Sequence, residues 1–451
     1  MSFPRYPSYK DSGVEWLGKV PWHWDVLALK SRFQIIGGST PKSETESFWN
    51  GDILWATPSD LSKRDSVYIN DTQRKITATG LASCGTRLVP AGSIVLSTRA
   101  PIGSLAIAET AMCTNQGCKS LIPTKNANTD FFAYLLSISS TELNIRGKGT
   151  TFLELSGDEL GAFKTPVPPH PEQTQIAAFL DRETAKIDEL VTEQRRLMAL
   201  LKEKRQAVIS HAVTQGLNPH APMKPSGIEW LGDVPKHWSS PKLKTLAIDQ
   251  PAAFTNGPFG SDLLTSELHV EGVPVIYIRD LKIDGYRRRS TSYVTADKAI
   301  QLDKFRVDEN DILIAKVGDP PGFCCTYPKG EPPGIICQDV IRMKPNLELV
   351  LPDYLCFLLN SPPGVEAVDS ICIQLTRKRF SLADLHSLRL PLPPRPEQGE
   401  ILNWLKRIVG EFCNLTTEAQ RAIDLLQERR TALISAAVTG QIDVRGAVDS
   451  P

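Results

Sequence analysis

The sequence predicts an α+β protein in which two mixed α/β domains are joined by two long helices. The helices are expected to form an intramolecular antiparallel coiled coil with pseudo-two-fold symmetry. Two repeats predict this architecture. A motif at residues 10–24 recurs at 224–238 with 11 of 15 positions identical, and a segment at 165–218 recurs at 390–443 with 23 of 54 identical. The expected divisions are a first motif and domain (1–164), a central helical segment (165–218), a second motif and domain (219–389) and a C-terminal helical segment (390–451).

The third observation is that the blocks between the repeats differ. Residues 25–164 and 239–389 share only a loose echo, such as Asn115-Gln116-Gly117 against Cys337-Gln338-Asp339. Equal frames make equal contacts and unlike blocks make unlike contacts, so we expect one duplicated frame that holds two different blocks. The alternative is a duplication with drift, in which both blocks do the same job.

Each block is expected to be mixed α/β. The β-branched runs at 93–97 and 311–315 predict strands, and residues 130–136 and 353–359 predict short helices capped by aspartate. Asp319-Pro320-Pro321-Gly322 and Ser361-Pro362-Pro363-Gly364 are similar to a signature of DNA amino-methyltransferases. Both carry glycine where that signature needs a stacking aromatic residue, so we interpret them as turns.

The repeated helical segments have clear start signals. Pro171 and Pro396 suit the first helical position, and a Pro-Pro run precedes each. A continuous helix from Pro171 to Thr214 would be about 65 Å long and needs a partner to bury its apolar stripe. The other copy is the available partner. The heptad-like seam is expected at Ile187, Leu190, Gln194, Leu197, Leu201, Lys204, Val208 and His211, matched by Phe412, Leu415, Ala419, Ala422, Leu426, Arg429, Leu433 and Ala436.

Composition excludes several classes of protein. The chain has 51 basic and 51 acidic residues, which excludes a histone-like polycation but allows a local basic face. Hydrophobic residues at 41% and charged ones at 23% are typical of a globular protein. No apolar run approaches the roughly 18 residues of a membrane span, and the first residues lack a secretory signal, so we expect a cytoplasmic protein. The nine cysteines form no CxxC pair, which indicates reduced, buried thiols rather than a zinc site.

No motif in the sequence requires covalent chemistry. The chain lacks the phosphate-binding GxxxxGK[ST] loop, the GxSxG nucleophile turn and the HExxH metal motif. We therefore expect a protein that is not itself an enzyme, with no metal bound by this chain.

Three motifs occur twice: SG(V/I)EWLG(K/D)VPxHW, PPxPEQ and L(K/Q)E(K/R)RxAxISxAVT. Together they resemble the specificity (S) subunit of Type I restriction-modification enzymes, over the whole chain. The resemblance implies a non-catalytic DNA-recognition subunit with two target recognition domains, in a system that defends against foreign DNA. It also implies a bacterial or archaeal protein that is associated with the nucleoid. It implies as partners double-stranded DNA, two methyltransferase (M) subunits and two restriction/translocase (R) subunits. S-adenosylmethionine, ATP and Mg then belong to those subunits. The alternatives are a stand-alone DNA adenine methyltransferase and a coiled-coil scaffold without DNA recognition.

If the resemblance holds, each block reads one half of an asymmetric bipartite target in the major groove, where all four base pairs can be distinguished. The helices then fix an unspecific spacer of around six base pairs. Residues 37–41 and Asp60-Leu61 also resemble the start of a recognition domain. Base readers are expected to be Arg, Lys, Asn or Gln on loops, and the alternative for the basic clusters is solvated loops. The DNA-binding candidates are Arg99, Gln116, Lys148, Thr150, Thr151, Arg287, Arg288, Lys316, Gln338, Arg377, Lys378 and Arg379.

Two identical methyltransferases would need two similar docking surfaces. The duplicated candidates are exposed helix faces and four tryptophans of the repeated motif: Trp16, Trp24, Trp230 and Trp238. Aromatic residues often anchor interfaces. The alternative, given equal weight, is that these tryptophans pack the frame onto the helices.

Overall fold

The computed structural model describes residues 3–62, 66–99, 101–148, 153–228, 230–258, 260, 262–318, 320–373 and 378–447. The chain divides into two compact units. The first contains Met1–Gln194 and Gln420–Pro451, and the second contains Arg195–Ala419. Each unit therefore includes half of each repeated helical segment. Over the described ranges, no helix is long and apolar enough to cross a membrane.

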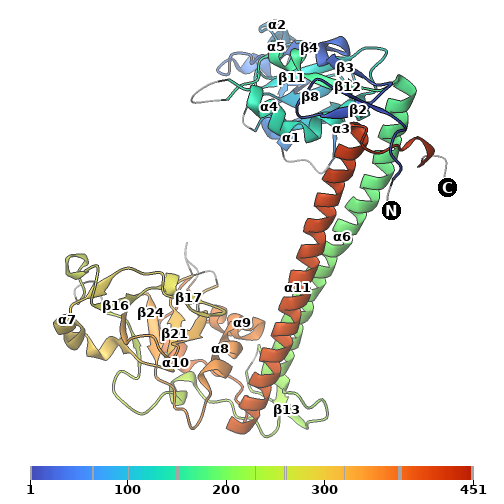
Figure 1. The fold of residues 1–451 in the computed structure, drawn as a ribbon. Coiled ribbons are helices and arrows are strands. Elements are labelled where there is room, and N and C mark those ends of the chain that lie inside the picture. The colour runs from blue at the N-terminus through green and yellow to red at the C-terminus, as the bar shows by residue number, and fades with distance from the viewer. Residues whose placement is uncertain are drawn as a thin grey trace. The chain divides into compact units, whose positions relative to one another are not determined.

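The first unit has a five-stranded sheet in the order β4-β11-β8-β9-β6 and a three-stranded sheet in the order β10-β5-β7 (Figure 1). All four side chains of β8 (Ile94–Ser97) are buried, which confirms the strand predicted at 93–97. Helix α3 (Thr129–Ile138) confirms the predicted helix at 130–136 and buries Phe131 and Phe132 in the core. The other elements are β1 Tyr9–Asp11, β2 Lys19–Pro21, β3 Asp25–Ala28, β4 Phe33–Gly37, β5 Trp49–Ala56, α1 Pro58–Ser62, β6 Tyr68–Ile69, β7 Lys75–Ile76, α2 Ala78–Ala82, β9 Leu105–Ala108, β10 Cys113–Thr114, β11 Cys118–Pro123, α4 Ser140–Arg146, α5 Gly157–Ala162 and β12 Lys164–Val167.

The second unit has two four-stranded sheets, in the orders β15-β24-β21-β22 and β19-β16-β23-β20. Strand β21 (Ile312–Ala315) is fully buried and confirms the strand predicted at 311–315. Helix α8 (Pro352–Asn360) confirms the predicted helix at 353–359. The other elements are β13 Met223–Pro225, β14 Asp233–Pro235, β15 Phe254–Asn256, β16 Val273–Ile276, β17 Leu281–Lys282, β18 Gly285–Tyr286, β19 Tyr293–Val294, α7 Ala296–Gln301, β20 Arg306–Val307, β22 Cys324–Thr326, β23 Gly334–Ile336, β24 Val340–Met343, α9 Pro362–Ser370 and α10 Leu382–Ser387.

The two dissimilar blocks have the same core topology. The strand order β4-β11-β8-β9 of the first unit corresponds to β15-β24-β21-β22 of the second. In both units the second sheet contains a parallel pair, β5 with β10 and β16 with β23. Two sequences that share little can fold alike because each places buried apolar runs at corresponding points of the chain.

Two local predictions were wrong. Aspartate does not cap the short helices: the side chain of Asn128 accepts a hydrogen bond from the Phe131 amide at the start of α3, and α8 has no side-chain cap. The segment Ser361–Gly364 is not a turn, because Ser361 caps α9 by accepting from the Gly364 amide, with prolines at the first helical positions.

The repeated helical segments form α6 (His170–Gln215) and α11 (Arg395–Val438). In the first unit the start of α6 packs with the end of α11, where Leu180 and Ile434 share one core (Figure 1). In the second unit the end of α6 packs with the start of α11, where Val213 and Leu405 share another. The helix halves within each unit are therefore antiparallel.

Part of the predicted seam was wrong. Ile187 is buried as predicted, but Leu190 and Leu415 are 51% and 49% exposed, while Val191 and Ile423 are buried. From Ile187, the next buried position on the helix is therefore four residues along, at Val191. The prediction had placed it three residues along, at Leu190. Both spacings place apolar residues on one helix face, so the contacts decide between them.

A carboxylate in the first turn of each long helix explains why the frame is repeated. Glu172, in the first turn of α6, accepts hydrogen bonds from His23 Nε2 at 2.8 Å and Trp24 Nε1 at 3.1 Å. In the second unit, Glu397 in the first turn of α11 accepts from His237 Nε2 at 2.7 Å and Trp238 Nε1 at 3.1 Å. The VPxHW and PEQ motifs therefore recur together because the side chains of one bind the carboxylate of the other.

The docking assignment is wrong for two of the four tryptophans. Trp24 and Trp238 are 0% and 1% exposed, so they offer no area to a partner and instead pack the frame. Trp16 is partly buried and stacks on Phe163 with ring centroids 5.4 Å apart, and Trp230 is also partly buried. For Trp16 and Trp230, docking stays a prediction.

Candidate nucleic-acid interface

Three segments meet at one end of the central sheet in the first unit: Thr98 and Arg99 after β8, residues 115–117 before β11, and Lys148 with Glu154 from the loop after α4. The Thr98 amide donates to the Gly117 carbonyl at 2.8 Å. Glu154 forms isolated bridges with both Arg99 and Lys148. These contacts bring Arg99, Gln116 and Lys148 into one cluster, although they lie far apart in the sequence.

The second unit has the same arrangement in residues 316–318, 337–339, 371–373 and 378–379. The Lys316 amide donates to the Asp339 carbonyl at 2.9 Å. Arg379 forms isolated bridges with Val317 and Ile373, as Glu154 does in the first unit. We call these two groups of loops the three-loop clusters. The sequence similarity between Asn115-Gln116-Gly117 and Cys337-Gln338-Asp339 therefore has a structural basis. Each segment occupies the corresponding position in the three-loop cluster of its unit.

A glycine backbone packs closely against each three-loop cluster. A Cβ on Gly38 would overlap the Asn115 carbonyl oxygen, and one on Gly257 would overlap the Cys337 carbonyl oxygen. Only glycine permits such a close approach. In the first unit this segment also positions a candidate base reader, because the Thr40 hydroxyl donates to the Gln116 side chain.

Several predicted cations are already paired with carboxylates. Arg99 lies 3.0 Å from Glu154 and Lys148 lies 2.7 Å from Glu159; both cations keep large exposed fractions, 43% and 80%. The Lys148 ammonium holds the pKa of Glu159 below its usual range. In the second unit, Lys378 lies 2.6 Å from a carboxylate, that of Asp369. A DNA phosphate or base edge would have to displace these carboxylates.

The other predicted site residues fall into three groups. In the second cluster Lys316 is half-buried, and Gln338 and Arg379 are exposed. Arg287 and Arg288 lie outside the clusters, after β18, where they pair with Asp284 and Glu331. Thr150, Thr151 and Arg377 lie outside the described residues.

Sequence reasoning missed a buried carboxylate beside each cluster. Asp60 accepts from the amides of Thr57 and Gln73 at 2.8 and 2.9 Å. Asp280 accepts from the amides of Tyr277 and Ser290, both at 2.8 Å. Asp60-Leu61 and the matching Asp280-Leu281 were the available signal. Each aspartate ties the turn after a core strand to a distant segment, so we call these the anchored turns.

A cavity of about 500 Å³ lies between the anchored turn and the three-loop cluster of the first unit. Pro101 and Asn115 line it from the cluster side, and Thr57 lines it from the turn. Arg74 lines the same cavity and places its guanidinium carbon 3.5 Å from the ring centroid of Trp49. The cavity therefore borders the segments that carry two of the predicted base readers, Arg99 and Gln116.

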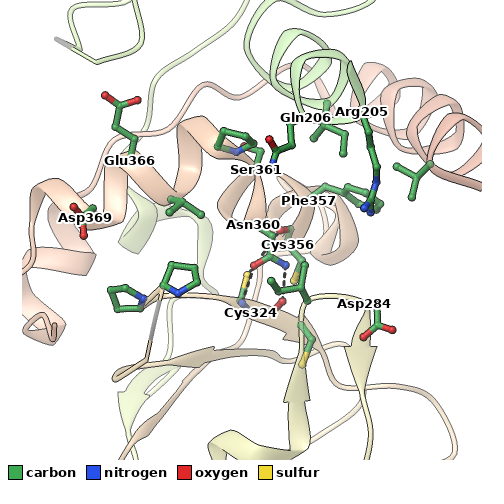
Figure 2. Close-up of a pocket in the computed structure, with 18 of the residues that line it drawn as sticks. Arg205, Gln206, Asp284, Cys324, Cys356, Phe357, Asn360, Ser361, Glu366 and Asp369 are labelled. Atoms are coloured by element: carbon green, nitrogen blue, oxygen red, sulfur yellow. Dashed lines mark hydrogen bonds between the residues drawn. The ribbon is translucent and has the colours of Figure 1, made fainter. Parts of the chain in front are cut away.

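The second unit contains a larger groove of about 1430 Å³ between α8, α9 and the long helices. Figure 2 shows Arg205 and Gln206 of α6 across the groove from Phe357 of α8. The Asn360 side chain also lines the groove and donates a hydrogen bond to the Cys324 carbonyl at 2.8 Å. The lining mixes basic, acidic and apolar side chains, so no single ligand chemistry is defined there.

The predicted burial of the cysteines is confirmed in part. All nine are free, and five are buried, whereas Cys413 is exposed. Burial raises the pKa of Cys113, Cys118 and Cys325 to about 12, which disfavours the reactive thiolate. No group of three potential metal ligands occurs within the part of the chain that the structure describes.

The fold defines a class of protein in which a repeated helical frame carries two recognition blocks of common topology and different loop chemistry. A family model for the Type I restriction modification DNA specificity domain matches residues 21–197 and 271–424. The chain belongs to this family.

Individual relatives agree with that assignment. The Type I restriction enzyme MjaIX specificity subunit of Methanocaldococcus jannaschii is 36% identical over 190 residues, 42% of this chain and 43% of the relative. The EcoBI specificity subunit of Escherichia coli is 24% identical over 356 residues, 76% of this chain and 72% of the relative. The chain therefore spans less than half of the first relative's length and about seven tenths of the second's.

Solved structures share the fold. A chain from a study of complex assembly and conformational transition of the type I R-M system has a TM-score of 0.70 at 15% identity, over 93% of this chain and 98% of that one. The HsdS subunit from Thermoanaerobacter tengcongensis has a TM-score of 0.58 at 16% identity, over 96% of this chain and 100% of that one.

Proposed function

We propose that this chain is the DNA sequence-recognition subunit of a Type I restriction-modification complex, and that each unit reads one half of an asymmetric bipartite target. One observation carries the proposal: the two three-loop clusters have matching backbone contacts and different side chains. Arg99 occupies the place of Val317, and Glu154 occupies the place of Arg379. Matching backbones dock in the same way, whereas different side chains select different base pairs.

The base readers of the first half-site are Arg99, Gln116 and Lys148, and Thr150 and Thr151, which follow closely in the sequence, are further candidates. Those of the second are Lys316, Gln338, Lys378 and Arg379, and Arg377, the preceding residue in the sequence, is a further candidate. Arg287 and Arg288 contact the backbone of the duplex near the anchored turn. Before DNA binds, the paired carboxylates hold these cations in place. Binding breaks the ion pairs, so a DNA sequence that offers the cations no equivalent contact binds more weakly.

The two long helices act as an antiparallel coiled-coil ruler between the half-sites, related by a pseudo-two-fold axis. Antiparallel packing within each unit supports this role. In the first unit, Arg430 of α11 also pairs with Asp188 of α6 through contacts of 2.9 and 3.3 Å. A helix of 46 residues is about 69 Å long if straight, enough for two recognition blocks about one DNA turn apart with a spacer of around six base pairs.

Exposed leucines on the helices are the docking surfaces for two methyltransferase subunits. Leu190 and Leu425 are 51% and 56% exposed in the first unit. In the second unit, Leu415 and Leu200 occupy the equivalent repeat positions and are 49% and 53% exposed. Large apolar side chains that stay exposed in duplicate suit a partner that binds in duplicate. Trp16 and Trp230, which lie in the two copies of the repeated motif, are further candidates for these docking surfaces.

The chain performs no covalent chemistry in this scheme. S-adenosylmethionine, ATP and Mg are used by the methyltransferase subunits and by the two restriction/translocase subunits. Absence of the catalytic motifs named above from the sequence supports this division and disfavours a stand-alone methyltransferase. A scaffold without DNA recognition would not need two clusters of different polar side chains on matching loops.

Methylation mapping of DNA from cells that express the chain with its methyltransferase partner tests the proposal. Arg99→Gln should relax one position in one half-site, and Arg379→Gln one position in the other half-site. Lys125→Gln is the matched control, because this exposed lysine lies beyond the opposite end of β11. A contiguous or self-complementary wild-type motif would contradict the bipartite reading.

A further inference from the structure

The cavity beside the first three-loop cluster contains an arginine that is held in a different way from the predicted base readers. Arg74 is exposed and stacks on Trp49, and its guanidinium carbon also lies 5.6 Å from the ring centroid of Trp55. Among the described residues no carboxylate lies within ion-pair distance of Arg74. Stacking on an aromatic face fixes the guanidinium plane while leaving its N–H groups free to donate.

The two tryptophans that contact Arg74, Trp49 and Trp55, are buried and are connected to the cluster. Their rings meet edge to face at 5.1 Å. Trp49 Nε1 donates to the Lys42 carbonyl at 3.2 Å, and Trp55 Nε1 donates to the Ser39 carbonyl at 3.0 Å. Ser39 precedes Thr40, which donates to the Gln116 side chain. The same indole pair therefore positions Arg74 and the segment that orients a base reader.

The rest of the cavity lining suits an anion bound through hydrogen bonds. It contributes the hydroxyls of Ser59 and Ser62 and the amide side chains of Gln73 and Asn115. These are the residue types that contact DNA phosphates. The one carboxylate in the lining, Asp60, is 8% exposed and already accepts from two backbone amides and from the Thr57 hydroxyl at 2.5 Å.

The second unit places an arginine on an aromatic ring at its own anchored turn. The guanidinium carbon of Arg279 lies 5.0 Å from the ring centroid of Tyr277, and its Nε donates to the Ser290 hydroxyl at 2.9 Å. Ser290 in turn donates to Asp280, the anchoring carboxylate. Both units therefore place an exposed arginine on an aromatic ring. The arginines and the rings stand at sequence positions that do not correspond between the two halves.

We propose that each anchored turn binds one backbone phosphate of the duplex next to the bases read by its three-loop cluster, through Arg74 in the first unit and Arg279 in the second. This inference rests on the proposed function. A phosphate fixed at this point sets the register of the duplex, so that the exposed side chains of the cluster face the correct base pairs. The arginines themselves select no sequence.

Salt dependence distinguishes this role from base reading. Each neutralised phosphate contributes about −0.9 to the slope of log affinity against log salt. The full chain, bound to its methyltransferase partner, is titrated with a duplex carrying the mapped target and with a random duplex of equal length. Arg74→Gln should reduce the slope by about 0.9 for both duplexes, so its affinity loss is about threefold larger at 50 mM than at 200 mM salt. The methylation motif should not change.

Four further variants complete the test. Arg279→Gln should have the same effect, and the double variant should reduce the slope by about 1.8. Arg74→Lys keeps a cation and should keep the slope, which separates loss of the contact from misfolding. Lys125→Gln should leave the slope unchanged. An unaltered slope in Arg74→Gln, or a changed methylation motif, would overturn the phosphate assignment. Wild-type binding that does not distinguish target from random duplex would instead refute the proposed function.

Discussion

Replacing the carboxylates of Glu172 and Glu397 should destabilise the two units unequally. Glu172 is 5% exposed and accepts from three side chains: Tyr6 at 2.6 Å, His23 at 2.8 Å and Trp24 at 3.1 Å. Tyr6 and Trp24 are buried, whereas His23 is 41% exposed and can turn to water. Glu172→Ala therefore leaves two buried donors without a partner, at about 1–3 kcal/mol each. The expected loss is about 2–6 kcal/mol.

The second unit supplies the internal comparison. Glu397 accepts from Trp238, which is buried, and from His237, whose side chain is 49% exposed. Glu397→Ala leaves one buried donor and should cost about 1–3 kcal/mol. Hydrogen exchange measures both losses in the full chain, through the opening free energies of the first turns of α6 and α11.

A double variant isolates the cause. Tyr6→Phe removes one of the stranded donors, so Glu172→Ala/Tyr6→Phe should regain part of the stability lost in Glu172→Ala. Equal losses in the two units, or no recovery in the double variant, would refute the reasoning that unpaired donors set the cost.

The remaining predictions concern the loops, the pH dependence and the docking faces. Gly38→Ala should abolish target binding because its Cβ overlaps a carbonyl oxygen, whereas Gly157→Ala, which has open space around it, should bind normally in the same titration. Burial raises the pKa of Asp311 to about 6. The folded chain thus holds this proton more tightly than the unfolded chain, and the stability of the second unit should fall by about 2–3 kcal/mol as pH rises from 4 to 7. Asp311→Asn should flatten that fall in unfolding measurements, and an unchanged profile would exclude this group as its source. Leu190→Ser or Leu415→Ser should reduce the methyltransferase copies bound per chain from two to one by native mass spectrometry; retention of two copies in both variants would exclude these faces.

The repeated frame could be predicted from the sequence because the identity between its two copies is visible without any structure. It also predicted the strands at 93–97 and 311–315, since a short β-branched run bounded by turn residues is a strong local signal. The seam was harder, because Leu190 and Val191 are both apolar and each completes a heptad spacing. Only contacts with the second helix reveal which of them is buried.

The shared topology of the blocks and the anchored turns could not be predicted from one sequence. Buried strands such as β8 and β21 tolerate many apolar combinations, so their equivalence leaves little identity. Asp60 and Asp280 acquire their role from amides 13 and 10 residues away. Arg74 and Arg279 reach comparable aromatic supports from different positions in the chain, which no alignment of the halves would pair.

The most direct test replaces residues 239–389 with a second copy of residues 25–164, so that one frame carries the same recognition block twice. The chimaera is expressed with the methyltransferase partner, and the methylated sites are mapped. The account predicts a self-complementary target made of two copies of the first half-site, with the original spacer. An asymmetric target identical to that of the wild-type chain would contradict it.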